Sequence, residues 1–222
     1  HRGGATLLRE PETLYRIVSA MRAALPARVP VTAKMRLGYS DTSQTLECAQ
    51  ALADGGAAEI AVHARTREQG YRPPADWTWL ARVREAVSVP VVANGDVVDL
   101  RSYREIRRVS GCEQVMIGRG LVACPDLALV IQRSCSGEAA AAMGWESLHP
   151  WLVDFYAQVR ERVVDRHVPG RLKQWLAMLA GVYPQARILF DQIRRQTCAD
   201  QVAELLEQGS AAQLLAAPSS TC

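Results

Sequence analysis

The chain has 222 residues, of which 49% are hydrophobic, and a formal net charge of +3 at pH 7. This size is enough for one large domain, or for one domain and part of a second, with a substantial core. No apolar run reaches the roughly 18 residues of a membrane span, and a charge this small does not by itself indicate nucleic acid. Lys34 and Lys173 are the only lysines among the 26 basic residues, and the others are arginines.

Taken in chain order, the first 135 residues alternate between helical and extended patterns. The opening segment, 3–8, is too short and too rich in glycine to predict an element. Amphipathic spacing predicts helices over 11–25, 45–53, 77–87, 100–109 and 127–133. Short apolar runs predict strands over 31–37, 59–64, 89–93 and 114–117. Strands that alternate with helices through short connections are typical of a parallel sheet flanked by helices.

The segment 136–145 consists mostly of small residues and is predicted to be a linker. Beyond it the strand pattern ends, and the predicted helices cover 148–159, 171–179, 185–195 and 199–207. Residues 146–215 are therefore predicted to form an all-α helical bundle domain, and 216–222 a disordered tail. The predicted core positions of the first of these helices are Leu148, Trp151, Leu152, Phe155 and Val159.

The six cysteines lack the spacing of a metal or redox motif. None forms C-x-x-C, and none is paired with a histidine at ligand spacing. We therefore expect free thiols in a reducing cytosol, no bound metal and a cytoplasmic location. The cysteines are Cys48, Cys112, Cys124, Cys135, Cys198 and Cys222.

Each of the four predicted strands ends in polar or charged residues. In a closed parallel barrel such ends meet at one mouth, whereas in an open doubly wound sheet they form a row. Four successive polar strand ends favour the barrel. Because a barrel needs eight strands, residues 1–135 are predicted to form the C-terminal half of a TIM-type (β/α)8 barrel, with the other half upstream. The glycine-bearing turns at 94–96 and 118–120 suit a phosphate, which backbone N–H groups can approach closely.

Five motifs in order carry a resemblance to a known family. They are Lys-Met-Arg-Leu-Gly at 34–38, Val-His-Ala-Arg-Thr at 62–66, Gln-Gly-Tyr at 69–71, Ala-Asn-Gly-Asp at 93–96 and Met-Ile-Gly-Arg-Gly at 116–120. In this order and spacing they resemble the tRNA-dihydrouridine synthases, and the segment 171–176 is most similar to the bacterial subgroup called DusC. The resemblance implies an FMN-dependent barrel that reduces uridine in the tRNA D-loop, at position 16 for this subgroup, with NADPH as the electron donor.

The resemblance also implies roles for individual residues. Lys34 would stabilise the anionic reduced flavin near N1 and O2, and His63 would hydrogen-bond the flavin. The ribityl phosphate would be held by Asn94, Gly95, Asp96, Gly118 and Arg119. The alternative for Lys34 is a strand-end lysine that leads to solvent. On their own, a histidine such as His63 is more often a satisfied core group, and the glycine motifs are usually turns.

The proton donor of this family is a cysteine in an Asn-x-x-Cys-Pro segment that lies just before the Gly-Gly-Ala motif. The present chain begins at that motif, and none of its cysteines matches the family position. We therefore expect no catalytic residue within these residues, and a chain that is inactive by itself.

The predicted tRNA contacts are Tyr71, Arg171 and Lys173. Tyr71 is in a polar loop, where an aromatic ring can stack on a splayed base, although it is equally expected to pack against its own loop. The segment 160–195 carries a net charge of +5 and includes Trp175 and Tyr183, which suits a tRNA-binding surface. The alternative is a solvated helix face.

Two other functions remain open from the sequence. One is a non-catalytic RNA-binding module, in which the helical part binds RNA and the barrel part is a remnant. The other is a different phosphate-binding barrel enzyme that acts on a small metabolite, although this leaves the basic helical part unexplained. We expect a monomer with tRNA as its partner and no membrane association.

Overall fold

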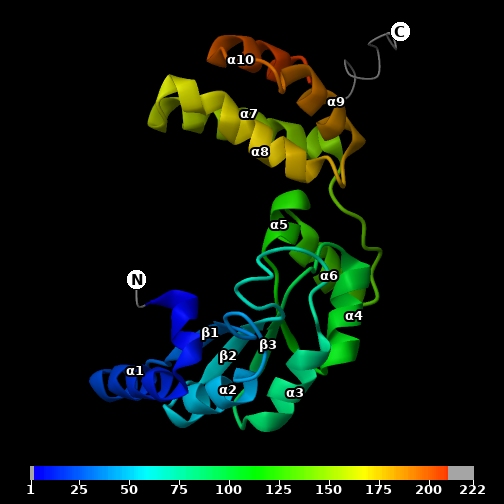
Figure 1. Cartoon of the computed structure of the whole chain (residues 1–222). Helices are drawn as coiled ribbons and strands as arrows, with labels where there is room; N and C mark the ends of the chain where they lie inside the picture. The colour runs from blue at the N-terminus through cyan, green and yellow to red at the C-terminus, as the bar shows by residue number, and fades with distance from the viewer. Residues whose placement is uncertain (1–2, 210–222) are drawn as a thin grey trace. The chain divides into compact units, whose positions relative to one another are not determined.

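The computed structural model describes residues 3–209, and Figure 1 shows its element order along the chain. The predicted tail at 216–222 and the last residues of the predicted helical domain lie outside this range. Contacts divide the chain into two compact units, His1–Gly118 and Arg119–Cys222, which are considered separately below. No helix among residues 3–209 is long and apolar enough to cross a membrane.

The first unit is a parallel sheet flanked by helices, as the alternating pattern predicted. Its four strands are β1 (Thr32–Arg36), β2 (Glu59–His63), β3 (Val91–Asn94) and β4 (Gln114–Met116), hydrogen-bonded in the order β1-β2-β3-β4. Each strand pairs in parallel with the next. The intervening helices are α1 (Pro11–Ala24), α2 (Thr45–Asp54), α3 (Thr78–Ala86) and α4 (Leu100–Ser110).

One face of this sheet is apolar and the other is polar. Met35, Val62 and Ala93 stand at matched positions on β1, β2 and β3, and they are buried in one cluster with side chains from α1 to α4. Successive side chains of a strand point to opposite faces, so their neighbours in the sequence lie on the other side. Lys34 and Arg36 of β1 therefore share the face that carries His63 and Asn94.

One expectation for the first unit was wrong. Residues Gly4–Arg9 form a short 3-10 helix, η1, although the segment was expected to be irregular. The chain can fold here because Leu8 is buried in the core of the first unit, where it contributes apolar contact that its glycine-rich flanks do not.

The second unit is entirely helical in its described part. It contains α5 (Arg119–Ala123), α6 (Leu127–Cys135), α7 (Trp145–Arg162), η2 (Asp165–His167), α8 (Val168–Leu179), α9 (Pro184–Ile193) and α10 (Ala199–Glu207). Leucine, isoleucine and aromatic side chains of α7 to α10 form one buried core. The unit begins earlier in the sequence than the predicted linker, because α5 packs against α8, and Trp175 Nε1 donates to the Val122 carbonyl at 2.9 Å.

The predicted core stripe of α7 was partly wrong. Leu148, Leu152 and Val159 are buried as expected, but Trp151 is 49% exposed. His149 and Tyr156 occupy the buried stripe as well, and both side chains donate hydrogen bonds to backbone carbonyls of the second unit. The buried stripe combines steps of three and four residues, and Trp151 lies outside it.

Candidate active site

Polar side chains from three neighbouring strands converge on the polar face of the sheet. Lys34 Nζ of β1 donates to Asn94 Oδ1 of β3 at 3.4 Å, across the whole width of β2. On β2, Ala61 is in register with Lys34 and His63 is in register with Asn94, so the contact crosses the strand diagonally, and the small methyl group of Ala61 leaves room for the lysine stem. Asn94 Nδ2 in turn donates to the Met116 carbonyl of β4 at 2.8 Å. Asn94 thus ties the cation on β1 to the end of β4.

The electrostatics of this face disfavour additional positive charge. The pKa of Lys34 is lowered by partial burial and by the nearby guanidinium of Arg36, with a smaller opposing effect from Tyr71. The pKa of His63 is lowered to about 4, mainly by burial and also by the charges of Arg36, Lys34 and Arg65, against the opposing effect of Asp96. His63 is therefore neutral at pH 7 and lies among basic side chains, a combination that suits an anionic or electron-rich ligand.

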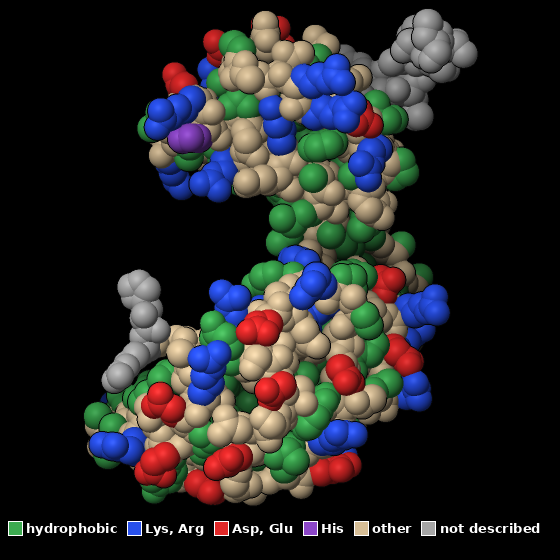
Figure 2. Space-filling view, viewed as in Figure 1, with side chains coloured by type: hydrophobic (Ala, Val, Ile, Leu, Met, Phe, Trp, Pro, Cys, Tyr) green, Lys and Arg blue, Asp and Glu red, His purple; other side chains and the backbone are tan. Residues whose placement is uncertain are grey.

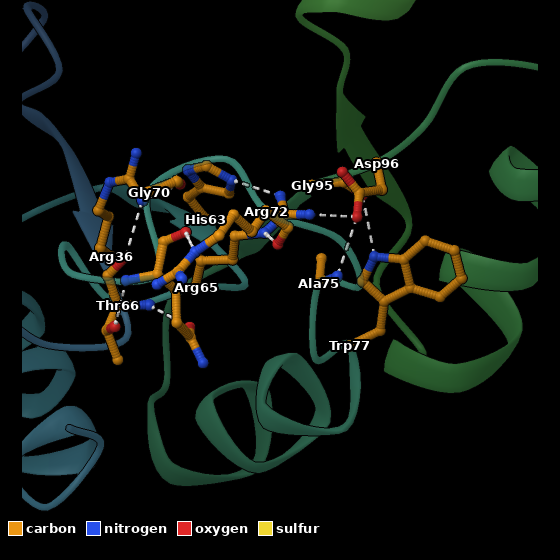
Figure 3. Close-up of polar contacts among 11 residues, drawn as sticks. Arg36, His63, Arg65, Thr66, Gly70, Arg72, Ala75, Trp77, Gly95 and Asp96 are labelled. Carbon is orange, nitrogen blue, oxygen red and sulfur yellow. Dashed lines mark hydrogen bonds and ion pairs between the residues drawn. The ribbon is translucent and has the colours of Figure 1, made fainter. Parts of the chain in front are cut away.

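A buried arginine organises the loops that follow β2 and β3 (Figure 3). Arg65 is fully buried, and each of its three nitrogen positions has a partner in this region. Nε donates to the Arg72 carbonyl at 2.7 Å, Nη1 lies 3.3 Å from His63 Nε2, and Nη2 forms an ion pair with Asp96. Our sequence analysis did not propose Arg65 as a site residue. The available signal was an arginine directly after a buried strand.

The turn at 94–96 is held in a conformation that requires glycine. Gly95 has φ +135° and Asp96 has φ +54°, and the Gly95 carbonyl accepts a hydrogen bond from Trp77 Nε1 at 2.9 Å. Asp96 Oδ2 also accepts from the Ala75 amide at 2.9 Å. The Asp96 carboxylate therefore serves to join two loops. The predicted contribution of Asp96 to phosphate binding stays a prediction. Because its carboxylate is engaged with Arg65 and the Ala75 amide, only the backbone groups of this turn are left to bind a phosphate.

Tyr71 stands over the same face at the tip of the loop that follows β2. Its side chain is 63% exposed, so the alternative in which it packs into its own loop is not what the structure shows. The Arg36 guanidinium lies 5.2 Å from the centre of the Tyr71 ring, and Arg36 Nη1 donates to the carbonyls of Thr66 at 2.9 Å and Gly70 at 2.8 Å. The His63 and Tyr71 ring centres are 6.0 Å apart. Arg36 therefore fixes the loop that presents the aromatic ring.

Gly118 and Arg119 fall on opposite sides of the division between the units. Gly118 is exposed, and a Cβ added to it would meet no atom within 4 Å. The backbone conformation of Gly118 does not require glycine, and a side chain here would not clash with other atoms. The glycine therefore leaves open space beside the backbone. Arg119 is exposed at the first position of α5. Their participation with Asn94 in one phosphate site stays a prediction.

The predicted RNA-binding residues of the helical unit have different surroundings. Arg171 is exposed on α8, whereas Lys173 is half-buried and its Nζ donates to the Gln196 carbonyl just beyond α9. Tyr183 is 5% exposed and is therefore a core residue, whereas the sequence had suggested that it belongs to a binding surface. Trp175 is half-buried and packs edge-on against Phe155, with the two ring centres 4.9 Å apart.

The other basic side chains of 160–195 are exposed, and Figure 2 shows basic side chains on the visible face of the helical unit. Arg160 and Arg194 are paired with Asp200 and Asp191. Among the described residues, five exposed arginines of this segment have no ion pair: Arg162, Arg166, Arg171, Arg187 and Arg195.

The buried thiols are not arranged for chemistry. Cys48, Cys112 and Cys124 are buried, and burial raises the pKa of all three, to about 11 for Cys48 and Cys124. Cys48 and Cys112 lie on the helix side of the first unit. Within residues 3–209 there is no group of three or more side chains suited to hold a metal ion.

Comparison with known proteins adds an independent line of evidence. Residues 1–216 match the family model described as dihydrouridine synthase (Dus). The chain is 51% identical over 205 residues to the tRNA-dihydrouridine(16) synthase of Aquipseudomonas alcaligenes, covering 92% of this chain and 65% of that protein. It is 49% identical over 216 residues to the enzyme of the same name from Pseudomonas putida, covering 97% and 66%. The chain thus spans just under two thirds of the length of these relatives.

Proposed function

Because this chain belongs to the dihydrouridine synthase family, we propose that the protein reduces uridine to 5,6-dihydrouridine in the D-loop of tRNA, at position 16, with FMN as cofactor and NADPH as electron donor. The position comes from relatives that are named tRNA-dihydrouridine(16) synthases. The observation that carries the proposal for this chain's own residues is the contact between Lys34 and Asn94, with His63 on the strand between them.

We propose that the sheet is one half of a closed (β/α)8 barrel. Its strand order follows the sequence without reversal, whereas a doubly wound sheet reverses direction at a switch point. The helices α1 to α4 share a core with one face only. The other face carries the polar side chains, as the interior and mouth of a barrel do in enzymes of this architecture.

The residues present fit a flavin mononucleotide. Lys34 supplies a positive charge where the electron-rich edge of an isoalloxazine ring would lie, and Asn94 holds the ammonium in place. His63 adds a neutral hydrogen-bonding group. Gly118 leaves open space where a phosphate can approach the backbone, and Arg119 follows it. When bound, FMN supplies hydride transfer, for which NADPH is the source of electrons.

The protein's own part in the reaction is binding, orientation and electrostatics. Lys34 stabilises negative charge on the ligand through a short-range interaction on a partly buried face. Tyr71, braced by Arg36, offers a ring on which an extruded pyrimidine can stack. Saturation of the uracil ring also needs a proton. We propose that Cys48 and Cys112 do not donate it, because they are buried on the opposite side of the sheet.

The test uses the protein encoded by the whole reading frame that contains these residues. With NADPH and unmodified tRNA it should give a mass increase of about two at uridine 16, since two hydrogen atoms add across one double bond. The purified protein should also be yellow from bound flavin. Formation of dihydrouridine at another position would overturn only the site assignment, whereas flavin-loaded protein that leaves uridine unchanged would overturn the activity.

A second function is favoured by one specific observation, the five exposed arginines without ion pairs in the segment 160–195 of the helical unit. A module with such a surface can bind RNA without catalysis. If residues 1–222 bind tRNA with a strong salt dependence but the whole protein forms no dihydrouridine, this alternative replaces the enzymatic one.

A further inference from the structure

The two ring nitrogens of His63 have different surroundings. Nε2 lies 3.3 Å from Arg65 Nη1, whereas Nδ1 makes no hydrogen bond to any described residue. A guanidinium group has five N–H donors and no acceptor, and it stays protonated in proteins. The contact is therefore a hydrogen bond only if Nε2 carries the lone pair, which leaves the single proton of a neutral imidazole on Nδ1.

The position of the Arg65 guanidinium is itself fixed. Its side chain is fully buried, and a buried guanidinium must keep all its partners. Nε is held by the Arg72 carbonyl at 2.7 Å, and Nη2 is held by Asp96, whose carboxylate also accepts from the Ala75 amide. Two loops therefore orient the group that contacts His63, and rotation of Arg65 away from the ring would break both (Figure 3).

We propose that Arg65 is a positioning residue that keeps His63 in its Nδ1–H form, so that the site presents an N–H donor to the bound ligand. The ligand atom that it recognises is then a hydrogen-bond acceptor, such as a carbonyl oxygen or an unprotonated ring nitrogen. In this respect the inference rests on the proposed function, because flavin has atoms of both kinds at the edge of its ring. A ligand that offers only N–H donors to His63 is disfavoured.

The charges around His63 support a neutral ring. Arg36, Lys34 and Arg65 face it as cations, Asp96 opposes them as an anion, and the Tyr71 ring lies 6.0 Å away. A histidine free in water favours the proton on Nε2, so an Nδ1–H ring needs a specific partner at Nε2. A purely structural Arg65 that only joined the two loops would not set the position of this proton. The two interpretations therefore differ in a measurable quantity.

The test is long-range 1H–15N correlation NMR of the 222-residue chain with 15N-labelled histidine. His63 is assigned by comparison with His63→Gln. The wild-type chain should show the Nδ1–H form of His63 from pH 5.5 to 8, and Arg65→Met should convert it to a mixture dominated by Nε2–H, with its pKa raised by about one unit or more. Arg67→Met, which removes an exposed arginine from the same loop, is the matched control and should change neither.

An Nε2–H ring in the wild-type chain would overturn the proposal, and this result needs no variant to fold. If Arg65→Met does not fold, Asp96→Asn provides the second variant, because it loosens Arg65 while keeping the guanidinium present. It should give a measurable fraction of Nε2–H, and an unchanged tautomer with clearly weakened stability would contradict a role for the Arg65 orientation. The measurement uses neither flavin nor RNA, so it can fail while dihydrouridine formation stands.

Discussion

Arg65 and Asp96 form an ion pair in which the guanidinium is completely buried, while the carboxylate side chain is 22% exposed. The pair joins the loop after β2 to the turn after β3, two segments that are 31 residues apart in the sequence. It also places Arg65 against His63. The polar mouth of the sheet is therefore held together by a charge pair beneath its surface, and the exposed groups rest on that pair.

The first prediction concerns the stability that this pair provides. Asp96→Asn should lower the free energy of unfolding by about 3 kcal/mol, because removing one member of a buried pair leaves the other without compensation. The double variant Arg65→Met with Asp96→Asn should cost less than the sum of the single changes. Urea denaturation followed by circular dichroism measures all three.

The matched control for that experiment is the exposed pair of Arg108 and Glu105 on α4, whose nitrogen and oxygen lie 2.5 Å apart. Glu105→Gln should cost much less stability than Asp96→Asn, because exposed pairs are weakened by water and by side-chain entropy. Equal losses of unfolding free energy for Asp96→Asn and Glu105→Gln would show that the burial of Arg65 does not strengthen its ion pair.

The second prediction is an acid sensitivity that depends on His63. The folded pKa of about 4 is below the ordinary value of 6.5, so the unfolded chain binds the proton more readily. Stability from this group is therefore complete above about pH 6.5 and is lost as the pH falls towards 4. His63→Gln should remove about 2 kcal/mol of the stability difference between pH 7 and pH 4.5. A variant with the same pH profile as the wild type would contradict the burial of a neutral ring.

The third prediction compares two glycines at the mouth. Gly95→Ala should destabilise the protein by about 1–3 kcal/mol, because φ is +135° and the new Cβ would lie 3.0 Å from Ala75 Cβ. Gly118→Ala should leave stability unchanged, since its Cβ would meet no atom within 4 Å. It should nevertheless weaken FMN binding if this space receives the phosphate. Thermal denaturation and a flavin titration separate the two effects, and undiminished flavin affinity in Gly118→Ala would remove the phosphate role of that turn.

The fourth prediction separates Arg171 from Lys173, which the sequence had grouped together. Arg171→Gln should reduce the slope of log affinity for tRNA against log salt by about one, with no loss of stability, because the side chain is exposed. Lys173→Gln should lower the melting temperature, because its Nζ satisfies the Gln196 carbonyl. Filter binding across a salt series and thermal denaturation are the measurements. A stable Lys173→Gln with a reduced salt slope would restore it as a phosphate contact.

The alternation of strands and helices was predictable because each element of the first unit carries its own apolar period. The 3-10 helix at Gly4–Arg9 was not, since one buried leucine stabilises it through contacts that a local pattern does not contain. Trp151 was misassigned for a related reason. Steps of three and four residues are both compatible with several adjacent stripes, and only the packing of α7 against its neighbours determines which stripe is buried.

The candidate site divides in the same way. Lys34, His63 and Asn94 were identifiable as polar residues at strand ends, because strand ends of a parallel sheet meet at one edge. The burial of Arg65 was not predictable, because it depends on a carboxylate in a different loop. The reach of Lys34 to Asn94 was not predictable either, because it depends on the strand order and on the small side chain of Ala61, which pairs with Lys34 on β2.

The most direct test of the central claim is the FMN affinity of the protein encoded by the whole reading frame, compared between wild type and Lys34→Met by quenching of flavin fluorescence. The matched control is Arg82→Met, which removes an exposed arginine whose guanidinium carbon lies 4.7 Å from the centre of the Trp79 ring. If Lys34 and the other strand-end groups hold the flavin, Lys34→Met should bind FMN at least about tenfold more weakly, a loss of about 1.4 kcal/mol, while Arg82→Met binds as the wild type does. Equal affinity in all three proteins would contradict a flavin site at this face of the sheet.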